Sequence, residues 1–199
     1  QSIVASRSRI PPKDSGWPSV GEPNVTILSD TIVITMESDH QASLLLLAEI
    51  VTDVIRHFLR SGLMLRGAIG WGEFTQRGNV FLGPAIDDTA AWHEATDWVG
   101  VIATPVTSFS IDRLSNINFA WEGKPLPAYV RYDVPLKGEK KTNLHALNWP
   151  GFLQCGYPSD SGKTVRQLMT KIFSEQQPFD ASVLKKYDNT LEFIDRIAS

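Results

Sequence analysis

The residue best placed to do chemistry is Asp30, an aspartate between two short apolar and β-branched segments, Asn24–Leu28 and Thr31–Met36. The alternation within each segment predicts a hairpin with Ser29 and Asp30 in its turn. The two strands would hold this carboxylate still, and the turn would leave it open to a ligand. Carboxylate oxygens bind the divalent metal ions that accompany phosphate chemistry. The same aspartate could instead satisfy only the backbone of its own turn.

A second group of special residues follows further along the chain. Arg66 lies in a predicted strand, Leu63–Phe74, that also contains three glycines. Glycines inside a strand usually mark a bulge or the close approach of another backbone or a ligand. Gly83 then leads into a predicted helix, Ala85–Asp97, with Asp87 in its first turn. A negative charge there is favoured by the positive end of the helix, which is the structural alternative to a chemical role.

The rest of the chain supplies elements that would position these residues. Apolar residues spaced three to four apart predict an amphipathic helix between the hairpin and the glycine-containing strand. That helix is predicted at Ala42–Leu63. The further predicted elements are helices at Thr107–Leu114, Ser161–Ser174 and Ser182–Ala198, and strands at Val80–Leu82, Val99–Ala103, Asn118–Trp121, Tyr129–Pro135 and Leu144–Trp149. This order of strands and helices predicts an α+β domain.

Composition excludes several classes of protein. The chain has 199 residues, of which 42% are hydrophobic and 21% charged, as in ordinary globular domains. A net charge of −3 argues against a nucleic-acid or membrane-surface binder, and no apolar run is long enough to cross a bilayer. The single cysteine, Cys155, forbids an internal disulfide and fits a reducing cytoplasm. We therefore expect a cytoplasmic protein with no nucleic-acid and no membrane partner.

Three parts are expected along the chain. Residues 1–24 are polar and rich in Ser and Pro, which predicts an irregular segment. Residues 25–150 carry the predicted catalytic domain, and residues 151–199 form a C-terminal helical segment. The last two helices could pack on the sheet or on a partner chain. Because the chain begins with Gln, we expect it to be a piece of a longer protein.

The order of hairpin, helix, glycine-containing strand, glycine turn and helix resembles the catalytic domain of the class III nucleotidyl cyclases. The residues that match the patterns of that family are Arg66, Gly67, Ile69, Gly72, Gly83, Ile86, Asp87 and Ala90. The likeness is closer to a divergent bacterial branch, which includes the pyrimidine cyclases of anti-phage signalling. It is carried there by residues 28–33, 65–73 and 81–85, and it spans residues 24–149.

This resemblance implies both a fold and an activity. The fold would be the ferredoxin-like class III cyclase fold, in which helices flank a central, mostly antiparallel sheet whose first strand precedes this chain. The activity would convert a nucleoside triphosphate, UTP or CTP in this branch, to a 3′,5′-cyclic nucleotide and pyrophosphate with Mg²⁺ or Mn²⁺. The family also implies a homodimer with its sites at the interface, and anti-phage signalling as the biological context.

The resemblance also assigns binding residues. Asp30 is expected to be one of two metal-binding aspartates, the other lying on a strand upstream of this chain. The purine-selecting Lys and Asp of the family fall at Thr26 and Val80. Purine selection as in adenylyl and guanylyl cyclases is therefore not expected. Instead, these two positions, together with Ser29 and Gly67, are expected to contact a different base or the rest of the nucleotide.

The catalytic positions depart further from the family. Its transition-state Asn and Arg fall at Asp87 and Ala91, so we expect Asp87 to be catalytic and Arg66 to replace the missing arginine. Loss of such an arginine without a replacement costs on the order of 10³-fold in rate. Arg66 could instead be a solvent-facing residue paired with Glu49 or Glu73. Two alternatives to an enzyme therefore stay open: an inactive cyclase-homology domain for dimerisation or nucleotide sensing, and an unrelated ferredoxin-like binding domain.

Overall fold

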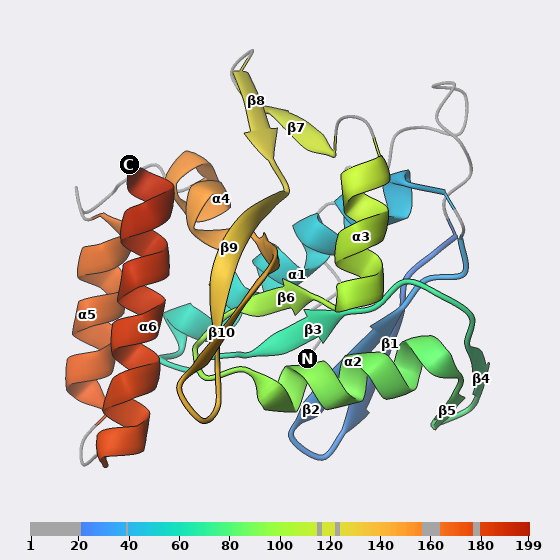
Figure 1. Cartoon of the computed structure of the whole chain (residues 1–199), viewed down its shortest axis with the longest axis horizontal. Helices are drawn as coiled ribbons and strands as arrows, with labels where there is room; N and C mark the ends of the chain where they lie inside the picture. The colour runs from blue at the N-terminus through green and yellow to red at the C-terminus, as the bar shows by residue number, and fades with distance from the viewer. Residues whose placement is uncertain (1–20, 39, 115–116, 122–123, 157–163, 177–179) are drawn as a thin grey trace. The chain divides into compact units, whose positions relative to one another are not determined.

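The computed structural model describes residues 21–38, 40–114, 117–121, 124–156, 164–176 and 180–199 (Figure 1). The chain divides into two compact units, one ending at Ser43 and the other beginning at Leu44. Over the described residues the fold is α+β, with six helices, one four-stranded mixed sheet and three two-stranded hairpins. The predicted α+β class is therefore confirmed. Most of the predicted irregular segment, 1–20, lies outside the described residues.

The first unit contains the predicted hairpin. Strands β1 (Asn24–Leu28) and β2 (Thr31–Thr35) pair antiparallel, in a register that places Leu28 opposite Thr31. This register leaves only Ser29 and Asp30 for the turn, as the sequence predicts. Such a short connection fixes the pairing of the two strands and therefore the position of both turn residues.

Helix α1 (Ala42–Arg60) begins at the end of the first unit and continues into the second. The further elements are β3 (Gly67–Ile69), β4 (Thr75–Arg77), β5 (Val80–Leu82), α2 (Pro84–Ala95), β6 (Val101–Ala103), α3 (Pro105–Arg113), β7 (Asn118–Trp121), β8 (Lys124–Pro127), β9 (Tyr129–Leu136), β10 (Lys140–Leu147), α4 (Trp149–Gly156), α5 (Val165–Glu175) and α6 (Ala181–Ala198). The predicted start of α5 at Ser161 falls outside the described residues.

The sheet of the second unit has the strand order β3-β6-β10-β9. Strands β3 and β6 run parallel, with Gly67 opposite Val101, whereas β10 is antiparallel to both of its neighbours. The sheet is therefore mostly antiparallel. A parallel pair needs a crossover connection, and α2 lies in the segment that joins β3 to β6 (Figure 1).

The core of the second unit joins the sheet to the C-terminal helices. The largest fully buried side chains include Trp98, Trp149 and Phe193. Trp98 stacks on Tyr132 of β9 at a centroid distance of 5.6 Å and meets Phe193 of α6 edge-on at 4.8 Å. Burying one Phe side chain is worth about 1.5–3 kcal/mol, so this contact ties α6 to the sheet. Helix α5 lies beside α6 (Figure 1).

The predicted strand Leu63–Phe74 is wrong in its extent, because only Gly67–Ile69 pairs in the sheet. Beyond Ile69 the chain carries Gly70 and Gly72, which pack against α2 instead of continuing the ladder. The local apolar pattern predicts a long strand, because it carries no information on the contact between this segment and α2.

The predicted strand Leu144–Trp149 is also wrong at its end. Strand β10 ends at Leu147, and α4 begins two residues later. The side-chain oxygen of Asn148 accepts a hydrogen bond from the backbone N–H of Gly151 at 3.2 Å, as an N-cap residue does. Pro150 is tolerated here because the N–H groups in the first turn of a helix have no acceptor within the helix.

Strand β8 is absent from the elements that the sequence predicts.

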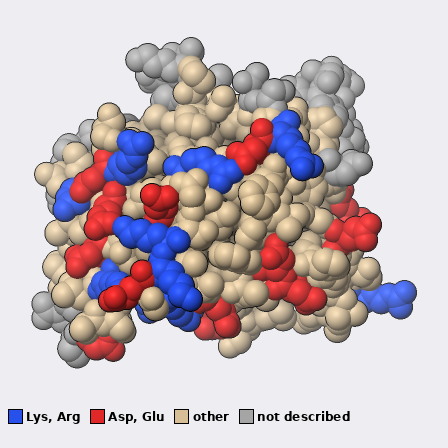
Figure 2. Space-filling model, viewed as in Figure 1, with Lys and Arg blue, Asp and Glu red and all other residues tan. Residues whose placement is uncertain are grey.

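Acidic and basic side chains are interspersed on the face shown in Figure 2. Ion pairs between described residues connect α6 to its neighbours, such as Arg166 with Asp195 and Lys141 with Glu192. Exposed pairs of this kind each contribute at most about 1 kcal/mol. None of the helices in the described part of the chain combines the length and the apolar composition that a membrane span requires.

Candidate functional site

The hairpin of the first unit presents Asp30 to solvent. Ser29 has a φ of 56°, and Asp30 follows it as the second turn residue. The carboxylate of Asp30 is exposed and accepts one long hydrogen bond, 3.5 Å, from the hydroxyl of Thr31. It is therefore held by the turn and left open to a ligand. Thr26, two residues before the end of β1, is half-buried.

Asp30 by itself does not make a metal site. Its oxygens are hard ligands of the type that Mg²⁺ and Mn²⁺ prefer. Within residues 21–38 and the other described ranges, however, no three His, Cys, Asp or Glu side chains gather in a way that could hold an ion. Among the residues that the structure describes, Asp30 is therefore a single candidate ligand.

In the second unit, Arg66 precedes the first residue of β3. Its side chain is exposed and forms neither an ion pair nor a hydrogen bond with another residue that the structure describes. The alternative pairing with Glu49 or Glu73 is therefore not observed. The backbone N–H of the next residue, Gly67, donates to the carbonyl of Gly100 at 3.0 Å. Arg66 thus stands next to a fixed backbone with an uncommitted guanidinium group.

The start of α2 is defined by Gly83. Its φ of 130° lies in the region that favours glycine, and a Cβ atom there would come within 2.7 Å of the carbonyl oxygen of Glu73. Pro84 then occupies the first helical position. The N–H groups of Ile86 and Asp87 both donate to the carbonyl of Gly83. The first turn is therefore closed by its own backbone, without a side-chain cap.

Asp87 is exposed in the first turn of α2, and Ala91 is exposed one turn later. The N–H of Ala85 donates to the carbonyl of Glu73 at 3.3 Å, so the described N–H groups of this turn have protein acceptors. A phosphate group would find no free backbone donor here, and the carboxylate of Asp87 would repel it. This position suits a hydrogen-bond donor of the ligand, such as a hydroxyl group.

The structure places Arg66 and Asp87 at different ends of β3. A Cβ atom on Gly70, just after the strand, would come within 2.8 Å of the carbonyl oxygen of Ala85, and one on Gly72 would meet the side chain of Ala85 at 3.5 Å. The first turn of α2 therefore lies beside the end of β3, whereas Arg66 precedes its beginning. No hydrogen bond or ion pair between described residues joins the two side chains.

Val80 begins β5 opposite Arg77 in the hairpin that precedes α2. It is 57% exposed, and Leu82, two residues later on the same face, is 64% exposed. The predicted site residues thus fall into two sets. Thr26, Ser29 and Asp30 belong to the first unit, and Arg66, Gly67, Val80 and Asp87 belong to the second.

Sequence reasoning missed a partly buried polar network in the second unit. The hydroxyl oxygen of Ser108 lies 2.9 Å from Nδ1 of His145 and accepts its backbone N–H at 3.0 Å. The carboxylate of Asp112 lies 3.8 Å from Nε2 of the same ring and is bound by Arg131. These are the residue types of a nucleophilic triad, but Ser108 is fully buried. No substrate could reach this hydroxyl group. The role of the network is instead structural, because its hydrogen bonds and ion pairs join α3 to β10 and β9.

This network predicts a dependence of stability on pH. Burial, followed by the charge of Arg131, lowers the pKa of His145 from its usual 6.5. The unfolded chain therefore takes up a proton at a higher pH than the folded chain does. Stability is complete above about pH 6.5 and falls as the pH drops below it, by at most about 1.4 kcal/mol per pH unit for one proton. Urea unfolding between pH 5 and pH 8 measures this slope.

His145→Asn is the matched variant for that measurement, because its amide group can form a hydrogen bond with Ser108 in place of Nδ1 but does not titrate. Its stability is expected to vary less with pH than that of the unaltered protein. Parallel pH profiles for the two proteins would show that His145 does not carry the effect.

Comparison with protein-family models, with curated proteins and with solved structures gives no match to this chain.

Proposed function

We propose that this chain is the catalytic domain of a nucleotide cyclase of the class III type, nearer to the pyrimidine cyclases of anti-phage signalling than to adenylyl cyclases. It would convert UTP or CTP to the 3′,5′-cyclic nucleotide and pyrophosphate. On this proposal the fold is the ferredoxin-like cyclase fold, and the active form is a homodimer.

The observation that carries this proposal is the correspondence between motifs and elements. The hairpin tip carries Asp30, an amphipathic helix follows, Gly67 begins β3, and Gly72 lies beside Ala85 at the start of α2. Gly83 occupies a backbone conformation that favours glycine, and Pro84 opens the helix after it. A chance likeness of single motifs would not be expected to fall on the right kind of element in the right order.

In the proposed reaction, the ribose 3′-hydroxyl gives its proton to a water molecule and its oxygen bonds to the α-phosphorus, while the bond from that phosphorus to the bridging oxygen breaks and releases pyrophosphate. Divalent ions supply charge neutralisation when bound. Asp30 would hold such an ion as one of several ligands. The exposed carboxylate of Asp87 would accept a hydrogen bond from a ribose hydroxyl, and Arg66 would supply positive charge.

One observation favours the alternative, an inactive cyclase-homology domain for dimerisation or nucleotide sensing. Asp87 and Ala91 stand where active relatives would carry Asn and Arg, and both are exposed. No described contact brings Arg66 to the position of Ala91 within one chain. For an active enzyme, Arg66 would therefore act on the site of the second chain of the dimer.

The test is incubation of the full-length protein with Mn²⁺ and with ATP, GTP, CTP and UTP in separate reactions, followed by mass spectrometry of the products. We expect a cyclic pyrimidine nucleotide and pyrophosphate in equal amounts. Binding of a triphosphate without any product would instead support the sensing module. Neither binding nor product, in a protein shown to be folded, would contradict both.

A further inference from the structure

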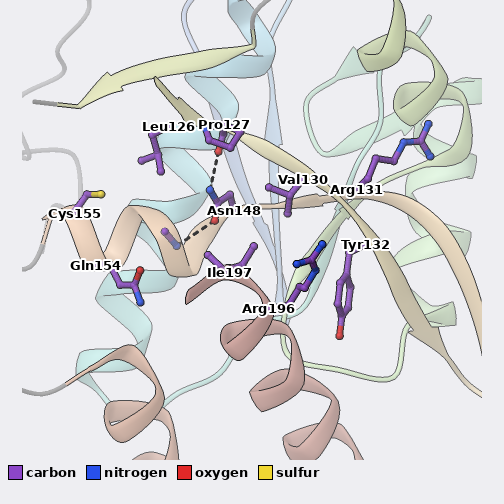
Figure 3. A pocket seen from close by; sticks show the side chains of 11 residues that line it. Leu126, Pro127, Val130, Arg131, Tyr132, Asn148, Gln154, Cys155, Arg196 and Ile197 are labelled. Carbon is purple, nitrogen blue, oxygen red and sulfur yellow. Dashed lines mark hydrogen bonds between the residues drawn. The ribbon is translucent and has the colours of Figure 1, made fainter. Parts of the chain in front are cut away.

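A cavity of about 360 Å³ lies in the second unit, between β9, α4 and α6 (Figure 3). Its volume is at the lower end of the range for small-molecule sites, roughly 300–1,000 Å³. The residues that line it are Leu126, Pro127, Val130, Arg131, Tyr132, Asn148, Gly151, Gln154, Cys155, Arg196 and Ile197. None of the candidate cyclase residues is among them.

Two of the polar lining residues are already committed to the fold. The amide group of Asn148 donates to the carbonyl of Pro127 at 2.9 Å, and its oxygen accepts from Gly151. Arg131 binds the carboxylate of Asp112 and the carbonyl of Asn143, and Figure 3 shows its side chain extending away from the other lining residues. These groups shape the cavity wall and have little capacity left for a ligand.

Two other polar residues remain uncommitted. The guanidinium group of Arg196 and the amide group of Gln154 form neither an ion pair nor a hydrogen bond with another described residue. Both are exposed, and Figure 3 shows Arg196 beside Tyr132. Burial, with Glu192 and Asp133 nearby, raises the pKa of Tyr132 to about 12, so its hydroxyl group stays neutral.

The charged residues that line the cavity are all basic. Among the described residues that line the cavity there are two arginines and neither aspartate nor glutamate. Since Arg131 is neutralised by Asp112, one positive charge remains, on Arg196. The aliphatic side chains of Leu126, Val130 and Ile197 supply the rest of the wall. Such a site favours a ligand with one negative charge and an apolar body.

We propose that this cavity binds a small organic monoanion, with one carboxylate paired to Arg196 and an aromatic or aliphatic body against the apolar wall. A guanidinium group binds a carboxylate in a bidentate way, and Gln154 offers further hydrogen bonds at the same rim. A phosphate group is a poorer match, because its charge at neutral pH approaches −2 and the cavity offers a single uncommitted cation.

Cys155 makes the proposal directly testable, because it is the only cysteine of the chain and lines this cavity. The probe is 1-naphthoate, and 1-naphthalenemethanol is the neutral molecule of the same shape. The rate at which Cys155 reacts with 4,4′-dithiodipyridine is measured against the concentration of each. We expect 1-naphthoate to slow the reaction to a saturating limit, with an affinity at least about tenfold above that of the alcohol.

Two variants complete the experiment. Arg196→Ala is expected to weaken 1-naphthoate binding by about tenfold or more and to leave the alcohol unaffected, without a change in melting temperature. Arg113→Ala removes an exposed arginine outside the cavity and is expected to change neither. The proposal is wrong if 1-naphthoate does not slow the reaction, if the alcohol slows it equally, or if Arg196→Ala binds 1-naphthoate as tightly as Arg113→Ala does.

Discussion

The Asp30→Asn variant is expected to form cyclic nucleotide more slowly than the unaltered protein by on the order of 10³-fold. Asparagine keeps the size of the side chain and its ability to support a turn, but it removes the negative charge. The exposed Asp30 has only one long hydrogen bond to a neighbour, so its charge is available to a ligand and contributes little to the fold. The measurement is the initial rate with Mn²⁺ and the preferred triphosphate.

Asp188→Asn is the matched control, because Asp188 is also an exposed aspartate but lies on α6. Both variants are expected to unfold within about 0.5 kcal/mol of the unaltered protein, as surface changes usually do. If Asp30→Asn retains the rate of the Asp188→Asn protein, Asp30 is a turn residue and not a metal ligand, and the assignment of the hairpin as part of the site fails.

The parts of the fold that could be predicted are those whose signal is local. The hairpin around Asp30 was predicted from alternation and turn residues, and the structure has the same two-residue turn. The predicted helix Ser182–Ala198 is confirmed. Its local signals are strong, because its apolar spacing spans many residues and Asp180 caps it by accepting a hydrogen bond from the backbone N–H of Val183. Helix α2 was placed to within two residues at each end by Gly83 and the pattern after it.

The parts that could not be predicted depend on contacts between distant segments. Ser108 and Asp112 are one turn apart on α3, which is visible in the sequence, but nothing local indicates that His145 on β10 lies between them. The cavity could not be predicted for the same reason, since Arg196 and Gln154 are separated by most of the C-terminal segment.

Asn148 did carry a local signal. An asparagine two residues before a proline is a usable helix start, and we interpreted that segment as the end of a strand.

Strand β3 is shorter than its local pattern predicts, and the residue that follows it, Gly70, packs against α2. Gly70→Ala is expected to destabilise the protein by about 3 kcal/mol. The new Cβ atom would lie 2.1 Å from the hydroxyl oxygen of Thr89 and 2.8 Å from the carbonyl oxygen of Ala85. Rotation of Thr89 would break the hydrogen bond that its hydroxyl donates to that same carbonyl at 2.6 Å. The carbonyl is a backbone atom and can move only with the first turn of α2.

Urea unfolding of three variants separates this contact from the general effect of replacing a glycine. Gly72→Ala is the control: its Cβ atom would meet only the side chain of Ala85, at an ordinary 3.5 Å, so a change within about 1 kcal/mol is expected. The double variant Gly70→Ala with Thr89→Ala removes the nearer contact and leaves the carbonyl of Ala85, so it should recover part of the loss. Equal stability of Gly70→Ala and Gly72→Ala would mean that α2 does not press on this end of β3. The glycine at position 70 would then need another explanation, such as room for a ligand.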